Sequence, residues 1–198
     1  MAISIEDIKR LRELTGVGMT DAKQALDAAK GDFDAALKEM RKKGLTKAEK
    51  RGEREARQGI VGTYNHDSRI GVVVEVNCET DFVARNEIFT NLVKDVAMHI
   101  AASSPQYVSA ENIPAAERGA KKQELLASDA LKGKPAEMAE KIVEGQLNKY
   151  FAERCLLDQP FIKNPDQNVG AYIKEHIAKL GENIVVRRFS RIALGEVA

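Results

Sequence analysis

Between residues 60 and 100, the spacing of apolar side chains changes from alternation to the period of a helix. Every second residue from 70 to 78 is apolar, which predicts a strand with one buried face. The residues expected on that face are Ile70, Val72, Val74, Val76 and Cys78. The segment 60–65 predicts a partner strand, and residues 66–69 predict the turn of a hairpin. A long helix is expected next, with an apolar stripe of Ile88, Phe89, Leu92, Val93, Val96 and Ile100.

The rest of the chain beyond residue 100 continues this mixed pattern. Helical spacing recurs over about 114–127, 135–154 and 168–180, and a last strand is expected over 183–194. That strand can pair with the hairpin. We therefore expect an α+β fold in which residues 59–198 form a core, with a three-stranded antiparallel sheet packed with helices.

The first 44 residues predict a separate module of three short helices. Ser4 and Asp32 are suitable N-caps for the first and third helices, and Gly44 is expected to stop the third. A unit this small has no room for a buried active site. We therefore expect residues 1–44 to act as a docking module.

Positive charge gathers between residues 38 and 58. This stretch holds nine Lys and Arg against four Glu, a net charge of +5, in a chain whose overall net charge is +1. It has few apolar anchors, so residues 45–58 are expected to form a basic, exposed helical linker. A solvated spacer is the interpretation favoured by such a charge run, while an arm that contacts RNA and a partner-docking segment stay open as alternatives.

The side chains that perform enzymatic or metal chemistry are not grouped in this sequence. Cys78 and Cys155 match no paired metal-ligand spacing, and the three histidines lie in separate predicted elements. Gly16 and Gly18 follow a helix and lack the third glycine of a dinucleotide site. We expect no enzyme, cofactor or metal site. With no long apolar segment and no secretory signal, the chain is expected to be cytoplasmic and to bind no membrane.

The segment 77–86 leaves two interpretations open for one aromatic side chain. Thr80 and Asp81 are helix-cap residues, and Phe82 follows them directly. A helix that starts at Asp81 would place Phe82 two turns before Phe89, in the core stripe. A helix that starts near Ala84 would leave Phe82 exposed at its tip.

Several segments resemble one known family along the length of the chain. They are RLRELTGVGMTDAKQAL (10–26), GDFDAALKEMRKKG (31–44), VNCETDFVARNEIF (76–89), EGQLNKYFAERCLLDQPFIKNP (144–165) and LGENIVVRRFSRI (180–192). In these segments and in their order, the sequence is similar to the elongation factor Ts family, the guanine-nucleotide exchange factors of elongation factor Tu. The resemblance implies an exchange factor that supports translation elongation, with elongation factor Tu as partner and no direct contact with nucleic acid.

The resemblance also implies which residues meet the partner. The three-helix module, similar to ubiquitin-associated domains, would contact the nucleotide-binding domain of elongation factor Tu through Leu11, Thr15, Gly16, Val17, Gly18 and Met19. The TDFV motif would enter the same domain and displace the bound magnesium, so that GDP leaves. Its residues are Thr80, Asp81, Phe82 and Val83. On this resemblance, Phe82 is expected to be an exposed wedge.

The hairpin departs from the arrangement in longer members of that family. GTYNHDSRIGVVV (62–74) resembles the hairpin of their second core half, where a turn histidine contacts the third domain of elongation factor Tu. That role would fall to His66. The same hairpin runs directly into the TDFV motif of the first half, so one core unit carries both features. Short members of the family replace the missing half by dimerising, and a homodimer is therefore expected here.

Overall fold

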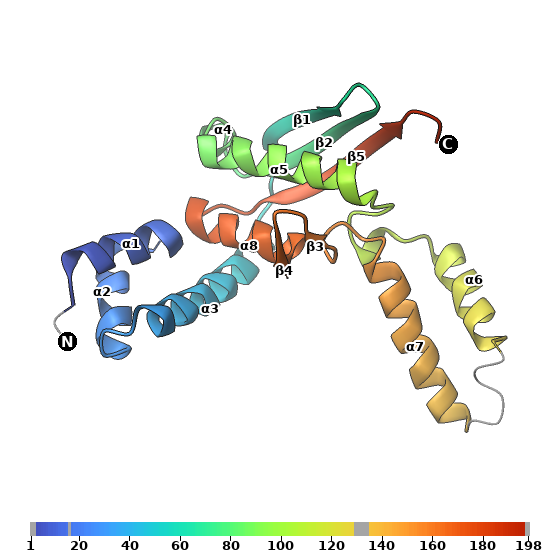
Figure 1. Cartoon of the computed structure of the whole chain (residues 1–198), viewed down its shortest axis with the longest axis horizontal. Coiled ribbons are helices and arrows are strands. Elements are labelled where there is room, and N and C mark those ends of the chain that lie inside the picture. Colours follow the sequence, from blue (N-terminus) through green and yellow to red (C-terminus); the bar gives the residue numbers. More distant parts are fainter. Residues whose placement is uncertain (1–2, 16, 129–134, 197–198) are drawn as a thin grey trace. The chain divides into compact units, whose positions relative to one another are not determined.

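The computed structural model describes residues 3–15, 17–128 and 135–196 (Figure 1). The chain divides into two compact units. The first comprises the chain up to residue 101 together with residues from 171 onward, and the second comprises residues 102–170. The architecture is the expected mixture of N-terminal helices and an antiparallel sheet packed with helices.

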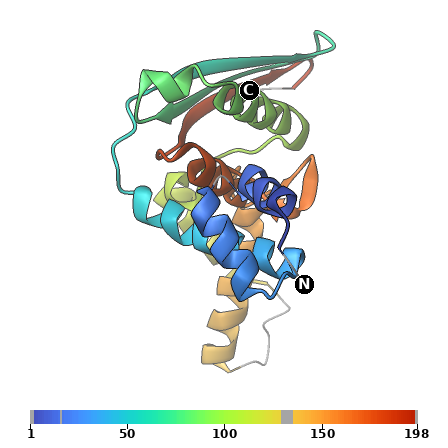
Figure 2. The ribbon, with the colours of Figure 1, turned by 90° about the vertical axis from the view of Figure 1, so that its left-hand side faces the viewer.

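The sheet of the first unit has three antiparallel strands in the order β1-β2-β5. They are β1 (Gln58–His66), β2 (Ile70–Cys78) and β5 (Val185–Ala193). The predicted buried face of β2 is confirmed at four of its five residues. Val72, Val74, Val76 and Cys78 are at most 2 % exposed, whereas Ile70 is half-buried. Helix α5 (Glu87–Ser103) lies along this face of the sheet, as Figures 1 and 2 show. Its predicted stripe is buried at Phe89, Leu92, Val93, Val96 and Ile100, while Ile88 is exposed.

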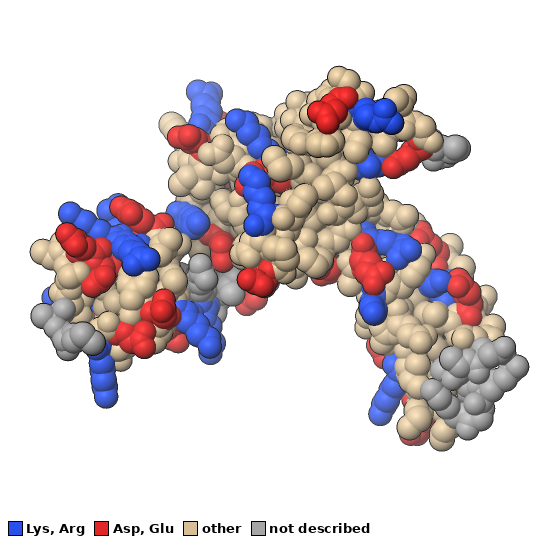
Figure 3. Space-filling view, viewed as in Figure 1, with Lys and Arg blue, Asp and Glu red and all other residues tan. Residues whose placement is uncertain are grey.

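The N-terminal helices are α1 (Ile5–Thr15), α2 (Met19–Ala28) and α3 (Phe33–Arg51). Two caps act as the sequence predicts: Ser4 Oγ accepts from the Asp7 amide at 3.0 Å, and Asp32 Oδ1 accepts from the Ala35 amide at 3.0 Å. The helices enclose a small apolar core of Ile8, Leu11, Ala22, Ala25, Leu26, Ala36 and Met40. Acidic and basic side chains are interspersed on the surface of this region that Figure 3 presents.

Gly44 does not stop the third helix, contrary to expectation, because α3 continues through it to Arg51. Helix α8 (Val169–Leu180) passes close by: a Cβ on Gly44 would lie 3.3 Å from Ala178 Cβ. A side chain here would crowd Ala178, so the glycine favours the close approach of the two helices, and α3 tolerates it. The division into 1–44, 45–58 and 59–198 stays a prediction.

Part of the basic segment is packed against another helix, although it was expected to be exposed. Ala48 is buried, Arg51 Nη1 donates to the Ile177 carbonyl at 3.1 Å, and Glu49 pairs with Lys174 of α8 at 3.2 Å. The first half of the predicted linker is thus a helix packed against α8. Because Arg51 is engaged in this way, the segment offers less free positive charge than its composition indicates.

The second unit is built around a hairpin of two helices, α6 (Ala115–Leu126) and α7 (Ala136–Ala152), near their predicted positions. A short 3₁₀ helix, η1 (Ala110–Asn112), precedes it, and β3 (Pro160–Phe161) pairs with β4 (Asn164–Asn168) after it. A cluster of Ile113, Leu147, Phe151 and Cys155 closes the base of the hairpin.

Candidate functional site

The end of β2 turns directly into a single helical turn, α4 (Asp81–Ala84). Thr80 is its N-cap: the backbone is extended there, and Thr80 Oγ1 accepts from the Val83 amide at 3.4 Å. Asn86 then starts a separate helix, because its side chain accepts from the Ile88 amide at 2.8 Å. The two caps make α4 a distinct element and not the first turn of α5.

Phe82 lies at the surface of this turn, with 84 % of its area exposed. The sequence left a core position and an exposed position open, and the structure has the exposed one. The break between α4 and α5 explains this outcome, since Phe82 no longer follows the helical register that leads to the buried Phe89. An aromatic side chain with this exposure is accessible to a partner.

The residues next to Phe82 differ in exposure. Asp81 is exposed and pairs with Arg85 at 3.3 Å, while Val83 is half-buried and Ala84 is buried. The structure therefore brings the four predicted residues 80–83 together on one turn. It offers an aromatic ring beside a carboxylate at the surface.

Glu182, a residue that the sequence analysis did not identify, accepts hydrogen bonds from the start of this turn. The carboxylate of Glu182, between α8 and β5, accepts from the amides of Glu79 and Thr80 at 3.1 and 3.0 Å. It also accepts from Thr80 Oγ1 at 2.6 Å. Glu182 lies within the quoted segment 180–192, but no spacing in the sequence indicates a contact with a residue 102 positions away.

The predicted contact residues of the N-terminal module lie at different depths. Leu11 is fully buried in the three-helix core, and Thr15 is 7 % exposed with its hydroxyl donating to the Leu11 carbonyl at 2.5 Å. Val17 is half-buried, whereas Gly18 and Met19 are exposed at the start of α2. Gly16 lies outside the described residues. Leu11 and Thr15 are therefore inaccessible to a partner, whereas Gly18 and Met19 are accessible.

His66 is the last residue of β1, beside the hairpin turn. Its side chain is exposed, and Nδ1 lies 3.2 Å from the hydroxyl of Tyr64, whose ring stacks on the imidazole. The register pairs His66 with Ile70 at one end of β2, while Thr80 follows the other end. At about 3.3 Å per residue, the length of β2 separates them by roughly 25–30 Å. The structure does not bring His66 to the 80–83 turn.

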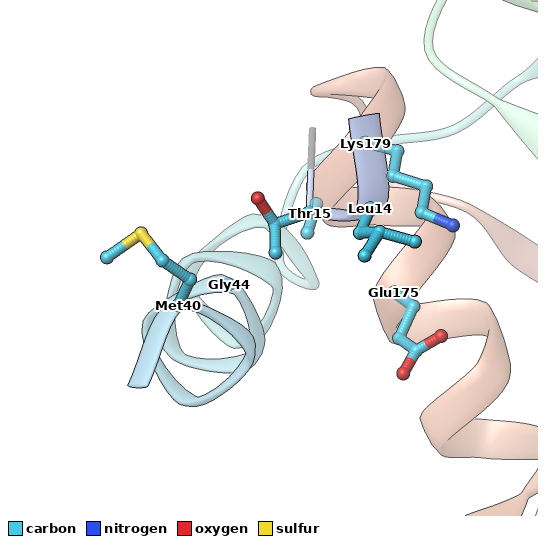
Figure 4. A pocket seen from close by; sticks show the side chains of 7 residues that line it. Leu14, Thr15, Met40, Gly44, Glu175 and Lys179 are labelled. Atoms are coloured by element: carbon cyan, nitrogen blue, oxygen red, sulfur yellow. The ribbon is translucent and has the colours of Figure 1, made fainter. Parts of the chain in front are cut away.

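The described residues have few groups that are arranged for metal or thiol chemistry. They contain no group of three or more His, Cys, Asp or Glu side chains that could bind a metal ion. Cys78 is buried, and burial raises its pKa to about 11, so its thiol is unreactive. The pocket in Figure 4, lined by residues of α1, α3 and α8, offers only Glu175 and Lys179 as charged groups.

Among the helices that the structure describes, none combines the length and the apolar character needed to cross a membrane.

The difference in burial between Phe82 and Phe89 can be tested by substituting each residue with Ala. We expect Phe82→Ala to leave the melting temperature nearly unchanged, because little of that ring is buried. Phe89→Ala should lower the free energy of unfolding by about 3–5 kcal/mol, because it empties a fully buried site. Denaturation followed by circular dichroism measures both. Equal destabilisation by the two substitutions would show that Phe82 belongs to the core.

Comparison with known proteins agrees with this picture over almost the whole chain. The family described as "Elongation factor TS" matches residues 11–196. The chain is 52 % identical to elongation factor Ts of Thermodesulfovibrio yellowstonii, over 99 % of this chain and 98 % of that protein. It is 53 % identical to elongation factor Ts of Moorella thermoacetica, over 98 % and 96 % of the two chains. This chain therefore belongs to the elongation factor Ts family, the nucleotide exchange factors for elongation factor Tu in translation elongation.

Proposed function

We propose that the turn formed by residues 80–83 enters the nucleotide-binding domain of elongation factor Tu and promotes GDP release by displacing magnesium. The observation that supports this most directly is Phe82, an 84 % exposed aromatic ring beside the carboxylate of Asp81. Thr80 caps the turn, and the half-buried Val83 joins it to the core side.

An exchange factor does not need catalytic side chains of its own. It must bind the nucleotide-free partner more tightly than the GDP-bound partner, and this difference in affinity sets how far the equilibrium shifts. Burial of a Phe side chain contributes about 1.5–3 kcal/mol. A ring that is exposed before binding can provide this free energy only in the complex, where it occupies space that the intact magnesium site requires.

Asp81 is available for a role at the magnesium site. Its carboxylate pairs with Arg85 at 3.3 Å, and both side chains are more than half exposed. An exposed ion pair of this kind contributes about 0–1 kcal/mol, so the carboxylate can leave Arg85 at little cost. Carboxylate oxygens are ligands that magnesium prefers, and Asp81 can therefore compete for or reorient groups around the ion.

The N-terminal module and His66 supply affinity away from the nucleotide. In this proposal Val17, Gly18 and Met19 form the docking surface, and Met19 is its main apolar contact at 40 % exposure. His66 contacts the third domain of elongation factor Tu. Its distance from Phe82, about the length of β2, allows the two residues to meet different parts of one partner.

The sheet supports a homodimer as the assembled form. The face of the sheet away from α5 presents Val61, Val73 and Ile192, which are 64, 47 and 74 % exposed. The strand register places all three on that face, together with the paired side chains of Glu75 and Arg188. A second copy that packs its own open sheet face here would bury these residues in a sheet-on-sheet interface.

Substitution of Phe82 should slow nucleotide exchange without changing the stability of the fold. Phe82→Ala is expected to slow GDP release from elongation factor Tu by one or more orders of magnitude, since each ~1.4 kcal/mol of lost barrier reduction is tenfold. Asp81→Ala should have a milder effect, because the ring remains. Release of fluorescent GDP in stopped flow measures both. Leu126→Ala, which removes an exposed apolar side chain from α6, is the control and should be unaffected. A stable Phe82→Ala protein with full activity would remove the wedge from the mechanism.

Substitutions at the outlying contacts should weaken binding. Met19→Asp places a charge in an apolar contact and should raise the concentration needed for half-maximal release. Ile5→Asp, at another exposed apolar residue of the module, is its matched control. His66→Ala should likewise lower affinity without changing thermal stability. Parent-like titrations for both variants would refute the two docking contacts.

The dimer is tested by sedimentation equilibrium. We expect the parent to be a dimer at micromolar concentration, and Val73→Asp or Ile192→Asp to shift it to monomers by burying a charge in the interface. Leu126→Asp is the matched control and should leave the dimer intact. A monomeric parent that is fully active as a one-to-one complex would overturn this assignment.

A further inference from the structure

We infer that Glu182 is a positioning residue for nucleotide exchange, which acts through Thr80 by fixing the orientation of the 80–83 turn before elongation factor Tu binds. The inference rests on the proposed function of that turn. It adds a residue from a different part of the chain, between α8 and β5, which does not itself reach the nucleotide.

The hydrogen bonds of Glu182 converge on the start of the turn. Its Oε2 accepts from the amides of Glu79 and Thr80, and its Oε1 accepts from the Thr80 hydroxyl. That hydroxyl in turn accepts from the Val83 amide and so caps α4. The rotamer of Thr80, and with it the first turn bearing Phe82, is therefore set by the carboxylate of Glu182.

The next residue anchors Glu182 itself. The Asn183 amide donates to Glu79 Oε1 at 2.6 Å, so the segments 79–80 and 182–183 bind each other reciprocally. Asn183 is 3 % exposed, and its side-chain amide donates to the carbonyls of Gly52 and Arg54 at 3.2 and 2.7 Å. Glu182 is thus held on a segment that is fixed on two sides.

The turn depends on such support because its own contacts are few. Helix α4 has four residues, far below the length at which a helix is stable alone. Phe82 is 84 % exposed before the partner binds, so its ring adds little packing to the turn. Hydrogen bonds to a carboxylate are stronger than those between neutral groups, and three of them fix the turn at its N-cap. A wedge already held in its binding geometry loses less conformational entropy in the complex.

The sheet does not depend on Glu182 in the same way. The valine face of β2 is buried against α5, and β2 is paired over its length with β1 and β5. We therefore expect Glu182→Ala to fold, with the same far-ultraviolet circular dichroism as the parent. Its amide protons at Glu79 and Thr80 should exchange with solvent faster than in the parent, while that of Val74 should not.

A double-mutant cycle tests whether Glu182 acts through the wedge. The maximal rate of fluorescent-GDP release from elongation factor Tu is measured for the parent, Glu182→Ala, Phe82→Ala and the double variant. Glu182→Ala should reduce this rate by about tenfold in the parent and by less than about twofold in the Phe82→Ala background. Glu182→Gln, which keeps one acceptor oxygen, should lie between Glu182→Ala and the parent. Glu49→Ala, which removes another carboxylate of the same unit, is the control and should leave the rate unchanged.

The other possible outcomes of this cycle distinguish failure of the inference from failure of the proposed function. An equal loss of rate in both backgrounds would overturn the inference, because the effect would then arise from the general fold. A parent-like rate for Glu182→Ala, together with a slow Phe82→Ala, would overturn the inference and leave the proposed function intact. A parent-like Phe82→Ala would overturn both. If Glu182→Ala does not fold, the same cycle with Glu182→Gln decides the question by the same criteria.

Discussion

Burial of one face of β2 fixes the position of the exposed turn at residues 80–83. Val72, Val74, Val76 and Cys78 are covered on that face, so a shift of the strand by a single residue would expose all of them. The end of the strand is therefore determined by the core. The buried Cys78 thiol, kept protonated by a pKa of about 11, donates to the Thr80 carbonyl at 3.1 Å. The core thus sets where the strand ends and where the exposed turn begins.

The elements of the fold could be predicted because their signals are local. Alternation over 70–78 and the helical stripe after residue 87 are each complete within one segment. The packing of Gly44 inside α3 could not be predicted, because it involves Ala178, a residue that no local pattern connects to it. The position of Phe82 was undecided for a similar reason: periodicity cannot show that Asn86 caps a new helix and interrupts the register. Glu182 could not be found at all, since its partners are more than 100 residues away in sequence.

The segment TGVGM (15–19) shows why a family motif does not distinguish residues that stabilise the fold from residues that a partner can contact. Leu11, just before this segment, and Thr15, at its start, are buried, while Met19 is exposed a few residues later. The resemblance to the family implies a partner contact for each of these residues. Only burial distinguishes a residue that stabilises the module from one that a partner can reach, and burial depends on how α1 and α2 pack.

An exposed ring at the tip of a rigid turn creates a physical difficulty, because apolar side chains of this kind also promote unspecific association. The surroundings of Phe82 reduce that tendency. Asp81 and Arg85 flank it as an exposed ion pair, and Glu87 follows at the start of α5. Charged neighbours must be desolvated whenever the ring is covered, which penalises any surface that cannot satisfy them. A partner with complementary polar groups, such as those around a bound magnesium ion, avoids this penalty. The charges of Asp81 and Arg85 therefore restrict which surfaces can cover the ring at low cost.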